Sequence, residues 1–391
     1  MRNFDVIIIG AGAAGLMCAR TAGQRGRRVL LLDHGDIAGA KIVISGGGRC
    51  NFTNLGAAAD RYVSANPHFC KSALTGFSQF DFIDMVKRHR IAYHERKHGQ
   101  LFCDDSARQI VRMLLDECNA ASVDLRLNHR VTEVTKADGF TVTTDHGLFT
   151  APAVVLATGG LSIPKMGATG FAFSVAKHFG LDVTETRPGL VPLKFSADDL
   201  ELMRALTGLS FDATVSCNGK SFTEAVLFTH RGLSGPAILQ VSSFWREGEA
   251  ITVNLLPETD ASAYLRDRRN TRPKAELKTI LGEVLPNRLA QKLTETRLPN
   301  PVIGGISNKV LEQVAALLNG WSLHPTGSEG YATAEVMTGG IATGALSSKT
   351  MEARSVGGLY AIGEAVDVTG WLGGYNFQWA WSSGWCAGMA V

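Results

Sequence analysis

DVIIIGAGAAG, at residues 5–15, is the stretch that decides the fold, and the apolar run VLLL at residues 29–32, which leads into Asp33, completes it. The pattern predicts a strand, a glycine turn, a helix over residues 13–25 and a second strand. A glycine turn by itself is a weak signal, but here a strand precedes it, a helix follows it and an acidic residue ends the second strand. The stretch therefore predicts the βαβ unit of an α/β domain that binds a dinucleotide.

Each glycine of the turn has a physical role in this prediction. Gly10 permits the turn, Gly12 leaves the backbone bare where a pyrophosphate approaches, and Gly15 lets the helix pack closely on the sheet. The pyrophosphate then lies at the start of the helix, where free N–H groups and the helix dipole favour negative charge. The Asp33 carboxylate is expected to accept hydrogen bonds from ribose hydroxyls and would repel a 2′-phosphate, which predicts FAD or NAD rather than NADP.

The composition describes a globular protein with more than one domain. Its 391 residues are long for a single core, and 45% of them are hydrophobic and 19% charged. The net charge of +3 argues against a strong field for nucleic acid or membranes, and no apolar run is long enough to span a bilayer. The seven cysteines are scattered without a C-x-x-C pair, which argues against a disulfide scaffold or a zinc site. A reducing, cytoplasmic location without a signal peptide is expected.

The changes of period along the chain predict a discontinuous dinucleotide-binding domain with other domains inserted into it. The apolar spacing switches from strand-like to helical and back again between the two parts of that domain. Asn218-Gly219 lies between two predicted strands and is a strong signal for a two-residue hairpin turn. The expected segments are residues 1–188 (first part of the dinucleotide domain), 189–256 with about 322–335 (a β-rich domain), 257–321 (a helical subdomain) and 336–391 (the C-terminal return of the dinucleotide domain).

Three further glycine clusters indicate places where a ligand meets bare backbone. A loop that carries Lys41 and then SGGGRCN at residues 45–51 is expected to cradle a phosphate or line a flat ring, with Arg49 paired to the pyrophosphate. A strand that ends in ATGG at residues 157–160 and one that ends in GE at residues 363–364 resemble fingerprints of flavoproteins of the glutathione-reductase type. An NAD dehydrogenase has no need of the last of these, so the pattern predicts FAD as the resident cofactor.

The segment after the last cluster predicts a helix that acts on the flavin. Asn376 is a good N-cap, and the residues after it have helical spacing. A helix start aimed at the pyrimidine edge of the flavin would stabilise the negative charge that develops on reduction. The residues expected to contact FAD are Gly10, Gly12, Ala13, Ala14, Gly15, Asp33, His34, Lys41, Gly46, Gly47, Arg49, Cys50, Asn51, Val131, Thr158, Gly159, Gly363, Glu364, Gly374, Asn376 and Phe377.

Three runs of sequence resemble one family of flavoproteins. They are KIVISGGGRCNFTN at residues 41–54, THRGLSGP at residues 229–236, and GEAVD with GGYN within residues 363–376. This pattern is similar to that of the BaiN/YhiN-type NAD(P)/FAD-dependent oxidoreductases, often labelled aminoacetone oxidase family FAD-binding enzymes. The resemblance covers almost the whole chain and implies a Rossmann-like FAD-binding domain with inserted β-barrel-like and small helical domains. Val43-Ile44 and Asp33 depart from the commoner residues of the family without changing the inferred chemistry.

The expected chemistry is hydride transfer between flavin N5 and a small organic substrate. His230 is a candidate general acid or base, with a structural role weighed equally, and Arg231 is a candidate partner for a substrate carboxylate or carbonyl. Cys50 is a candidate for contact with the flavin, although a packed, unreactive thiol is favoured. No second glycine turn follows a strand, so either NAD(P)H docks transiently over the flavin or the substrate itself reduces the flavin.

Three alternatives stay open beside this hypothesis. An amine oxidase would release hydrogen peroxide under air, and a non-catalytic flavin sensor would bind FAD without turnover. An RNA-binding flavoprotein has its only support in the basic run at residues 266–278, for which a solvated surface is the favoured interpretation. Nucleic acid and membranes are therefore not expected partners, and the substrate and the oligomeric state are left open by the sequence.

Overall fold

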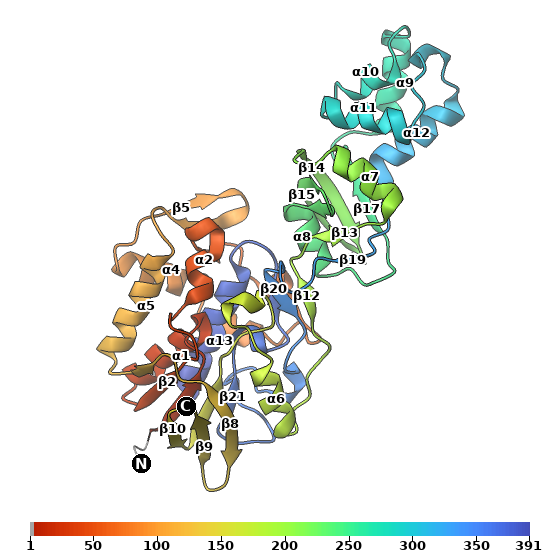
Figure 1. Cartoon of the computed structure of the whole chain (residues 1–391). Helices are drawn as coiled ribbons and strands as arrows, with labels where there is room; N and C mark the ends of the chain where they lie inside the picture. Colours follow the sequence, from red (N-terminus) through yellow and green to blue (C-terminus); the bar gives the residue numbers. More distant parts are fainter. Residues whose placement is uncertain (1–3) are drawn as a thin grey trace. The chain divides into compact units, whose positions relative to one another are not determined.

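The computed structural model describes residues 4–391, and the chain divides into two compact units (Figure 1). Unit 1 comprises Met1–Arg187 and Val336–Val391, and unit 2 comprises Pro188–Glu335. The chain thus leaves the first unit once and returns to it. Unit 2 holds both the β-rich and the helical segments, so the division of this part into two separate domains stays a prediction.

A parallel five-stranded sheet forms the centre of unit 1, in the order β21-β11-β1-β2-β7. Its central strand, β1, pairs in parallel with both neighbours, so that Ile7 lies between Val154 and Leu30. All of these strands except β7 are continuous apolar runs, because both faces of a parallel sheet are covered, whereas β7 at the edge has the sequence DLR and is half-buried. Their bounds are β1 (Val6–Ile9), β2 (Val29–Leu32), β7 (Asp124–Arg126), β11 (Ala153–Leu156) and β21 (Leu359–Ala361).

Two helices far apart in sequence pack against each other beside this sheet. They are α1 (Ala13–Gln24), which follows the glycine turn, and α13 (Tyr375–Ala390), at the end of the chain. Gly384 permits their close approach, because a Cβ there would lie 2.5 Å from the backbone oxygen of Ala14. The C-terminal segment is thereby held against the first helix of the predicted dinucleotide site.

The remaining elements of unit 1 cover the sheet or extend from it. The other helices are α2 (Ala40–Gly48), α3 (Lys71–Gly76), α4 (Gln79–Arg88), α5 (Arg108–Ala120) and α6 (Phe171–His178). The smaller sheets consist of β8 (Val131–Lys136), β9 (Phe140–Thr144) and β10 (Gly147–Ala151); β3 (Asn51–Asn54), β5 (Tyr93–Arg96) and β6 (Gln100–Cys103); and β4 (Tyr62–Val63) with β22 (Thr369–Gly370). Where the chain leaves unit 1 and returns to it, β12 (Arg187–Gly189) pairs with β20 (Val336–Thr338).

Unit 2 contains an antiparallel sheet and a group of helices. Its seven strands follow the order β18-β17-β14-β15-β16-β13-β19. The predicted hairpin turn is confirmed, because Asn218 and Gly219 have φ angles of 49° and 72° between the paired residues Cys217 and Lys220. The strands are β13 (Leu193–Lys194), β14 (Ser210–Cys217), β15 (Lys220–Thr229), β16 (Gly232–Ser234), β17 (Ile251–Asn254), β18 (Trp321–Leu323) and β19 (Gly327–Ser328). The helices are α7 (Ala197–Ala205), α8 (Pro236–Ser242), α9 (Ala261–Thr271), α10 (Leu277–Leu281), α11 (Asn287–Thr296) and α12 (Asn308–Gly320).

Within residues 4–391, no helix is both long enough and apolar enough to cross a membrane. The same residues contain no group of three or more His, Cys, Asp or Glu side chains arranged to hold a metal ion.

Candidate cofactor site

The glycine turn between β1 and α1 has the shape that a bound pyrophosphate requires. A Cβ on Gly10 would lie 2.4 Å from the oxygen of Ala157, and one on Gly15 would lie 1.8 Å from the oxygen of Gly10. Gly12 differs from both, because a Cβ on it would meet no atom within 4 Å. No side chain caps the start of α1, which faces this opening with its backbone N–H groups. The residues present therefore fit a phosphate group over Gly12.

Asp33 braces this turn from the end of β2. Its carboxylate accepts hydrogen bonds from the N–H of Ala11 at 2.6 Å and from the N–H of Gly35 at 2.8 Å. The side chain keeps 18% of its surface exposed, which leaves part of it open to a ligand such as a ribose hydroxyl. The His34 ring nitrogen Nδ1 lies 3.7 Å from Asp33. The sequence predicted a ribose contact for Asp33 but not this second role in shaping the turn.

The segment that leads to Val131 is hydrogen-bonded to the residues that follow β2. The N–H of Asn128 donates to the oxygen of Gly35, at 2.9 Å, and the N–H of His129 donates to the oxygen of Asp33, at 2.8 Å. Val131 begins β8 directly after this connection. Val131, predicted to contact FAD, therefore follows in the chain a segment that is hydrogen-bonded to the backbone of Asp33, the predicted ribose contact.

A polar cluster lies where β11 and β21 end. Lys41 Nζ donates to Ser162 Oγ at 2.8 Å and lies 3.2 Å from Glu364 Oε2. Ser162 Oγ donates in turn to Glu364 Oε1 at 3.0 Å, and the N–H of Met337 donates to the same oxygen at 2.9 Å. Lys41 keeps 34% of its side chain exposed, so its ammonium presents a remaining N–H outside the cluster. Glu364, predicted to contact FAD, is thus also the group that holds Lys41 in place.

Thr158 supplies a second sign that this corner accepts a ligand. Its hydroxyl oxygen is buried and has no hydrogen-bond partner among the described residues. Such orphaned hydroxyls are uncommon in folded proteins, because an unpaired buried polar group is costly. Gly159, next in the chain, has a φ angle of 73° and directs the backbone away from the sheet. Thr158 therefore fits a polar group of the cofactor, as the ATGG fingerprint predicted.

The second glycine cluster differs in part from the expected loop. The chain from Ala40 is helical (α2), and Ser45, Gly46 and Gly47 then interrupt the helix with non-helical backbone angles. The expectation that Lys41 lies in a loop is wrong, because Gly39 adopts a left-handed conformation that starts the helix before it. Arg49 follows the glycines with an exposed side chain.

The interrupted part of α2 presents bare backbone above an aromatic ring. A Cβ on Gly46 would lie 2.9 Å from the Phe102 ring, whereas one on Gly47 or Gly48 would meet no atom within 4 Å. A flat, open strip of this kind fits a planar ring system. Residues 45–48 are called the glycine strip below.

Cys50, directly after the glycine strip and Arg49, is a packed thiol. Its side chain is fully buried, and burial raises the pKa of the thiol far above its usual value. A buried thiol that stays protonated is a poor nucleophile. The favoured interpretation of Cys50 as unreactive agrees with this geometry.

The start of α13 differs from the prediction. The helix begins at Tyr375 after Gly374, which has a φ angle of 97°, so Asn376 is not its N-cap. The Asn376 side chain instead accepts from the N–H of Gly370 at 2.8 Å and donates to the oxygen of the same residue at 2.9 Å. Asn376 thus fixes the loop before the helix. Phe377, the third predicted residue here, stacks on Trp381 with ring centroids 5.6 Å apart.

Buried polar contacts hold this helix start in place. Thr53 Oγ1 donates to Gln378 Oε1 at 2.6 Å, and both side chains are fully buried. The Gln378 amide donates to the oxygen of Phe77 at 3.1 Å. The oxygen of the Asn51 side-chain amide faces the N–H of Gly374 at 3.3 Å. Sequence reasoning missed the pairing of Thr53 with Gln378, since it joins residues far apart in the chain.

The two predicted catalytic residues lie in unit 2, whereas the predicted cofactor residues gather in unit 1. His230 and Arg231 form the turn between β15 and β16. The hydroxyl of Thr229 accepts from the N–H of Arg231 at 3.2 Å and so shapes this turn. Arg231 is 60% exposed and pairs with Glu329 at 3.7 Å. The helix α8 begins at Pro236, directly after β16 and Gly235.

Comparison with known proteins identifies relatives over the whole length of the chain. A family model described as the HI0933-like protein Rossmann domain matches residues 4–390. A protein of Escherichia coli strain K12 named ribosomal RNA dihydrouridine synthase is 52% identical over 391 residues, which cover 99% of this chain and 98% of that protein. A protein of Clostridium scindens named 3-dehydro-bile acid delta(4,6)-reductase is 29% identical over 405 residues, covering 98% of each chain.

Solved structures share the fold at low sequence identity. The 3-ketosteroid-delta4-(5alpha)-dehydrogenase of Rhodococcus jostii RHA1, in complex with 4-androstene-3,17-dione, has a TM-score of 0.50 and 14% identity, and the match covers 99% of this chain and 97% of that one. The α/β, Rossmann-like fold class predicted from the glycine turn is confirmed.

Proposed function

Because the chain belongs to the HI0933-like Rossmann-domain family and is a flavin-dependent oxidoreductase, we propose that it reduces uridine in ribosomal RNA to dihydrouridine. The observation that carries this proposal is the 52% identity, over almost all of both chains, to the Escherichia coli protein of that name. The Clostridium scindens relative is named for the reduction of a different compound. Both names denote the reduction of a carbon–carbon double bond.

The reaction adds a hydride and a proton across the C5=C6 bond of the uracil ring. When bound, FAD supplies the hydride from N5 of its reduced form. The hydride adds to C6, the electron pair of the double bond moves toward the C4 carbonyl, and a proton adds to C5. We propose NAD(P)H as the donor of the two electrons that the flavin needs for each turnover, docked transiently since the chain has no second glycine turn of its own.

The residues of unit 1 bind and orient the cofactor in this proposal. The turn at Gly12 and the Asp33 carboxylate hold the pyrophosphate and the ribose, and the glycine strip lines the ring. The Lys41 ammonium, fixed by Ser162 and Glu364, offers positive charge where the reduced flavin gains negative charge. The N-terminus of α13 adds the positive end of a helix dipole.

His230 is our proposed proton donor to C5, with Arg231 as the group that holds a carbonyl of the base. The motif THRGLSGP supports both assignments, and a hydrogen bond to the Thr229 hydroxyl shapes the turn that carries both residues. His230→Ala is expected to keep FAD bound while turnover slows by about 10²–10⁴-fold, the range of general acid catalysis. Unchanged turnover would return His230 to a structural role.

The test of the function is direct detection of the product. Purified protein is reduced anaerobically with NADH or NADPH and mixed with ribosomal RNA that lacks modification. The nucleosides from an RNA digest are then separated and weighed by mass spectrometry. We expect a uridine that has gained the mass of two hydrogen atoms. A flavin that reacts with amines and releases hydrogen peroxide, with no dihydrouridine formed, would favour the amine oxidase alternative instead.

A further inference from the structure

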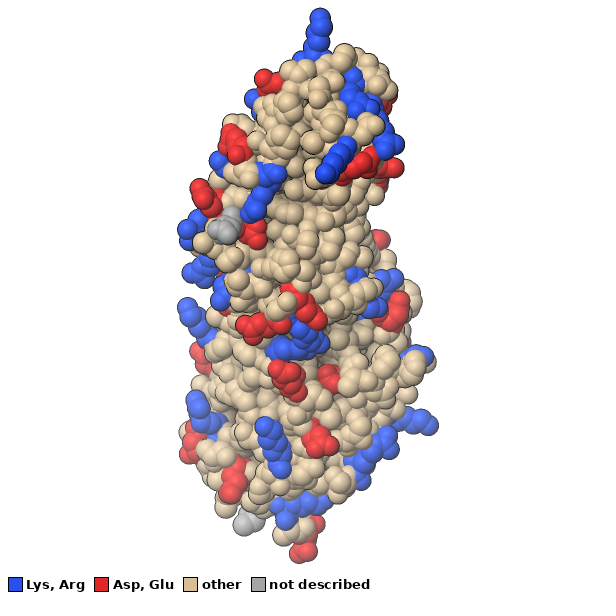
Figure 2. Space-filling view, turned by 90° about the vertical axis from the view of Figure 1, so that its right-hand side faces the viewer, with Lys and Arg blue, Asp and Glu red and all other residues tan. Residues whose placement is uncertain are grey.

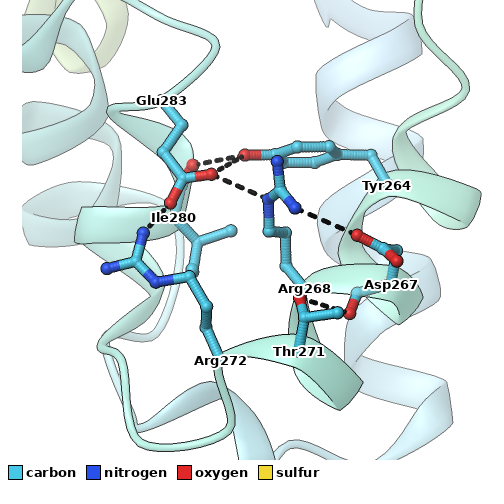
Figure 3. Close-up of polar contacts among 7 residues, drawn as sticks. All are labelled: Tyr264, Asp267, Arg268, Thr271, Arg272, Ile280 and Glu283. Carbon is cyan, nitrogen blue, oxygen red and sulfur yellow. Dashed lines mark hydrogen bonds and ion pairs between the residues drawn. The ribbon is translucent and has the colours of Figure 1, made fainter.

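If ribosomal RNA is the substrate, some surface must bind its phosphates, and the basic run at residues 266–278 does not provide it. Figure 3 shows that two of its arginines, Arg268 and Arg272, are paired with acidic side chains within unit 2. Arg268 Nε lies 2.7 Å from Glu283 Oε2, and the guanidinium of Arg272 pairs with the other oxygen of Glu283. Arg266 pairs with Glu312 in the same way. Carboxylates within unit 2 thus compensate the charges of Arg266, Arg268 and Arg272.

Elsewhere the basic side chains are mixed with acidic ones. On the face that Figure 2 shows, Lys and Arg are scattered among Asp and Glu. The net charge of +3 is a sum over the whole chain and does not tell whether positive charge is concentrated at one place on the surface. A phosphate-binding surface must therefore be sought as a small cluster whose charges have no acidic partners.

The hairpin formed by β5 and β6 in unit 1 carries such a cluster. Arg96 and Lys97 lie at its tip, and Arg88 and Arg90 lie in the chain just before it, all with exposed side chains. Arg88, Arg90 and Lys97 pair with no acidic side chain anywhere in residues 4–391, and Arg96 bonds to a histidine instead. Glu95 lies between two of these residues, but alternation along the strand directs it to the opposite face.

Arg96 is held flat in a stacked layer. Its guanidinium lies over the Phe102 ring, 4.5 Å from the ring centroid, and its Nε donates to His94 Nε2 at 3.2 Å. The His94 ring stacks on the same phenyl ring with an interplanar angle of 16°, and Asp104 fixes the other nitrogen of His94 at 2.6 Å. Arginine held in a plane offers its face to a nucleobase and its edge to a phosphate.

This layer adjoins the glycine strip. The Phe102 ring that supports Arg96 lies directly beneath Gly46, where a Cβ would approach it to 2.9 Å. The strand β6 is also hydrogen-bonded to the residue that follows the glycine strip, because the N–H of Cys103 donates to the oxygen of Arg49 at 2.9 Å. In Figure 1, β5 and α2 accordingly lie beside each other. The basic hairpin and the strip that we assign to the flavin ring are parts of one surface.

We propose that the β5–β6 hairpin binds the backbone of single-stranded RNA next to the flavin. Lys97 neutralises a phosphate, and the Arg96 plane supports an unstacked base or its phosphate. A nucleotide held there places its neighbour in the strand over the glycine strip. This inference rests on the proposed function and adds the location of the RNA to it.

The test compares a double variant of the hairpin with a matched one elsewhere. Arg96→Gln with Lys97→Gln removes two positive charges from the hairpin, and Lys274→Gln with Lys309→Gln removes two exposed charges from unit 2. Binding of a fluorescein-labelled, uridine-containing single-stranded RNA is measured by anisotropy at several salt concentrations. We expect Kd to rise at least tenfold in the hairpin variant and the salt slope of log Kd to fall by about 1.4, since each phosphate contact in a single strand contributes about 0.7.

The outcomes separate this inference from the function on which it rests. The matched variant should bind RNA within about twofold of the wild type, and both variants should purify with their full content of FAD. A wild type that binds and reduces RNA, together with equal losses in the two double variants, would overturn the hairpin proposal alone. A wild type that neither binds nor reduces the RNA would overturn the proposed function and the hairpin proposal with it.

Discussion

The geometry of the glycine turn predicts different effects for substitutions at Gly12 and at Gly15: the first should remove the cofactor and the second should damage the fold. Gly12→Val should leave the fold intact and remove FAD, because a Cβ at residue 12 meets no protein atom within 4 Å and instead enters the space assigned to the pyrophosphate. The backbone of Gly12 has a φ angle of −81° and a ψ angle of −169°, a conformation that any residue can adopt. Gly15→Ala should damage the fold itself, because its Cβ would lie 1.8 Å from the Gly10 oxygen.

The size of each effect follows from these contacts. Displacing the pyrophosphate from two backbone N–H donors costs about 1.5–3 kcal/mol for each charge-assisted bond, which weakens FAD binding by about 10²–10⁴-fold. The stability of the apoprotein should change by no more than about 0.5 kcal/mol in Gly12→Val. In Gly15→Ala, packed backbone must move by about an ångström to relieve the clash, so we expect a loss of about 3 kcal/mol or more.

The assay combines two measurements on each variant. Flavin absorbance after titration with FAD gives the dissociation constant, and urea unfolding of the apoprotein followed by circular dichroism gives the free energy of unfolding. Gly12→Val that binds FAD like the wild type would refute the placement of the pyrophosphate. Gly15→Ala with unchanged stability would refute the packing of the turn.

Three further predictions concern a buried hydrogen bond, a paired carboxylate and a buried thiol of unit 1. Thr53→Val should lower the free energy of unfolding by about 1–3 kcal/mol, because it leaves the buried Gln378 oxygen without its donor; a loss under about 0.5 kcal/mol in urea unfolding would contradict this. Burial would raise the pKa of Glu117, but hydrogen bonds, led by the one from His89, outweigh it and hold that pKa below its usual value. Glu117→Gln should therefore lower the free energy of unfolding by about 1–3 kcal/mol near neutral pH. The difference should start to shrink below about pH 4.5 and be lost as the pH falls through the lowered pKa of the folded state; a difference that persists at still lower pH would be inconsistent with the contacts of Glu117 to His89 and Arg20. Cys50 should resist iodoacetamide at about pH 8 until the protein is unfolded, as peptide mass mapping would show, and rapid labelling of the folded protein would exclude a packed thiol.

Local sequence signals predicted the central sheet and its turn well. The apolar strands, the glycine turn and the late strand at Leu359–Ala361 follow from short-range sterics and from burial on both faces of a parallel sheet. The family predicted from the three motifs is confirmed. The flavin-dependent enzyme class predicted with it is confirmed as well.

The features that the sequence did not reveal depend on contacts between distant residues. Ser162 lies in an irregular connection, and its role follows from Lys41 and Glu364, which come from opposite ends of the chain. Asn376 has the chemistry of an N-cap, yet its bonds to Gly370 make it a loop anchor instead. The β5–β6 hairpin is short and polar on one face, so its relation to the glycine strip depends on where Phe102 packs. None of these relations has a periodicity that could be read along the sequence.

The measurement that tests the central claim most directly is a single-turnover reaction. Protein with its flavin reduced and the excess nicotinamide removed is mixed anaerobically with unmodified ribosomal RNA, and flavin absorbance is followed while the nucleosides are weighed. The account predicts that the flavin is reoxidised and that one dihydrouridine forms for each flavin. A flavin that stays reduced in the presence of the RNA, and is reoxidised when oxygen is admitted, would contradict it.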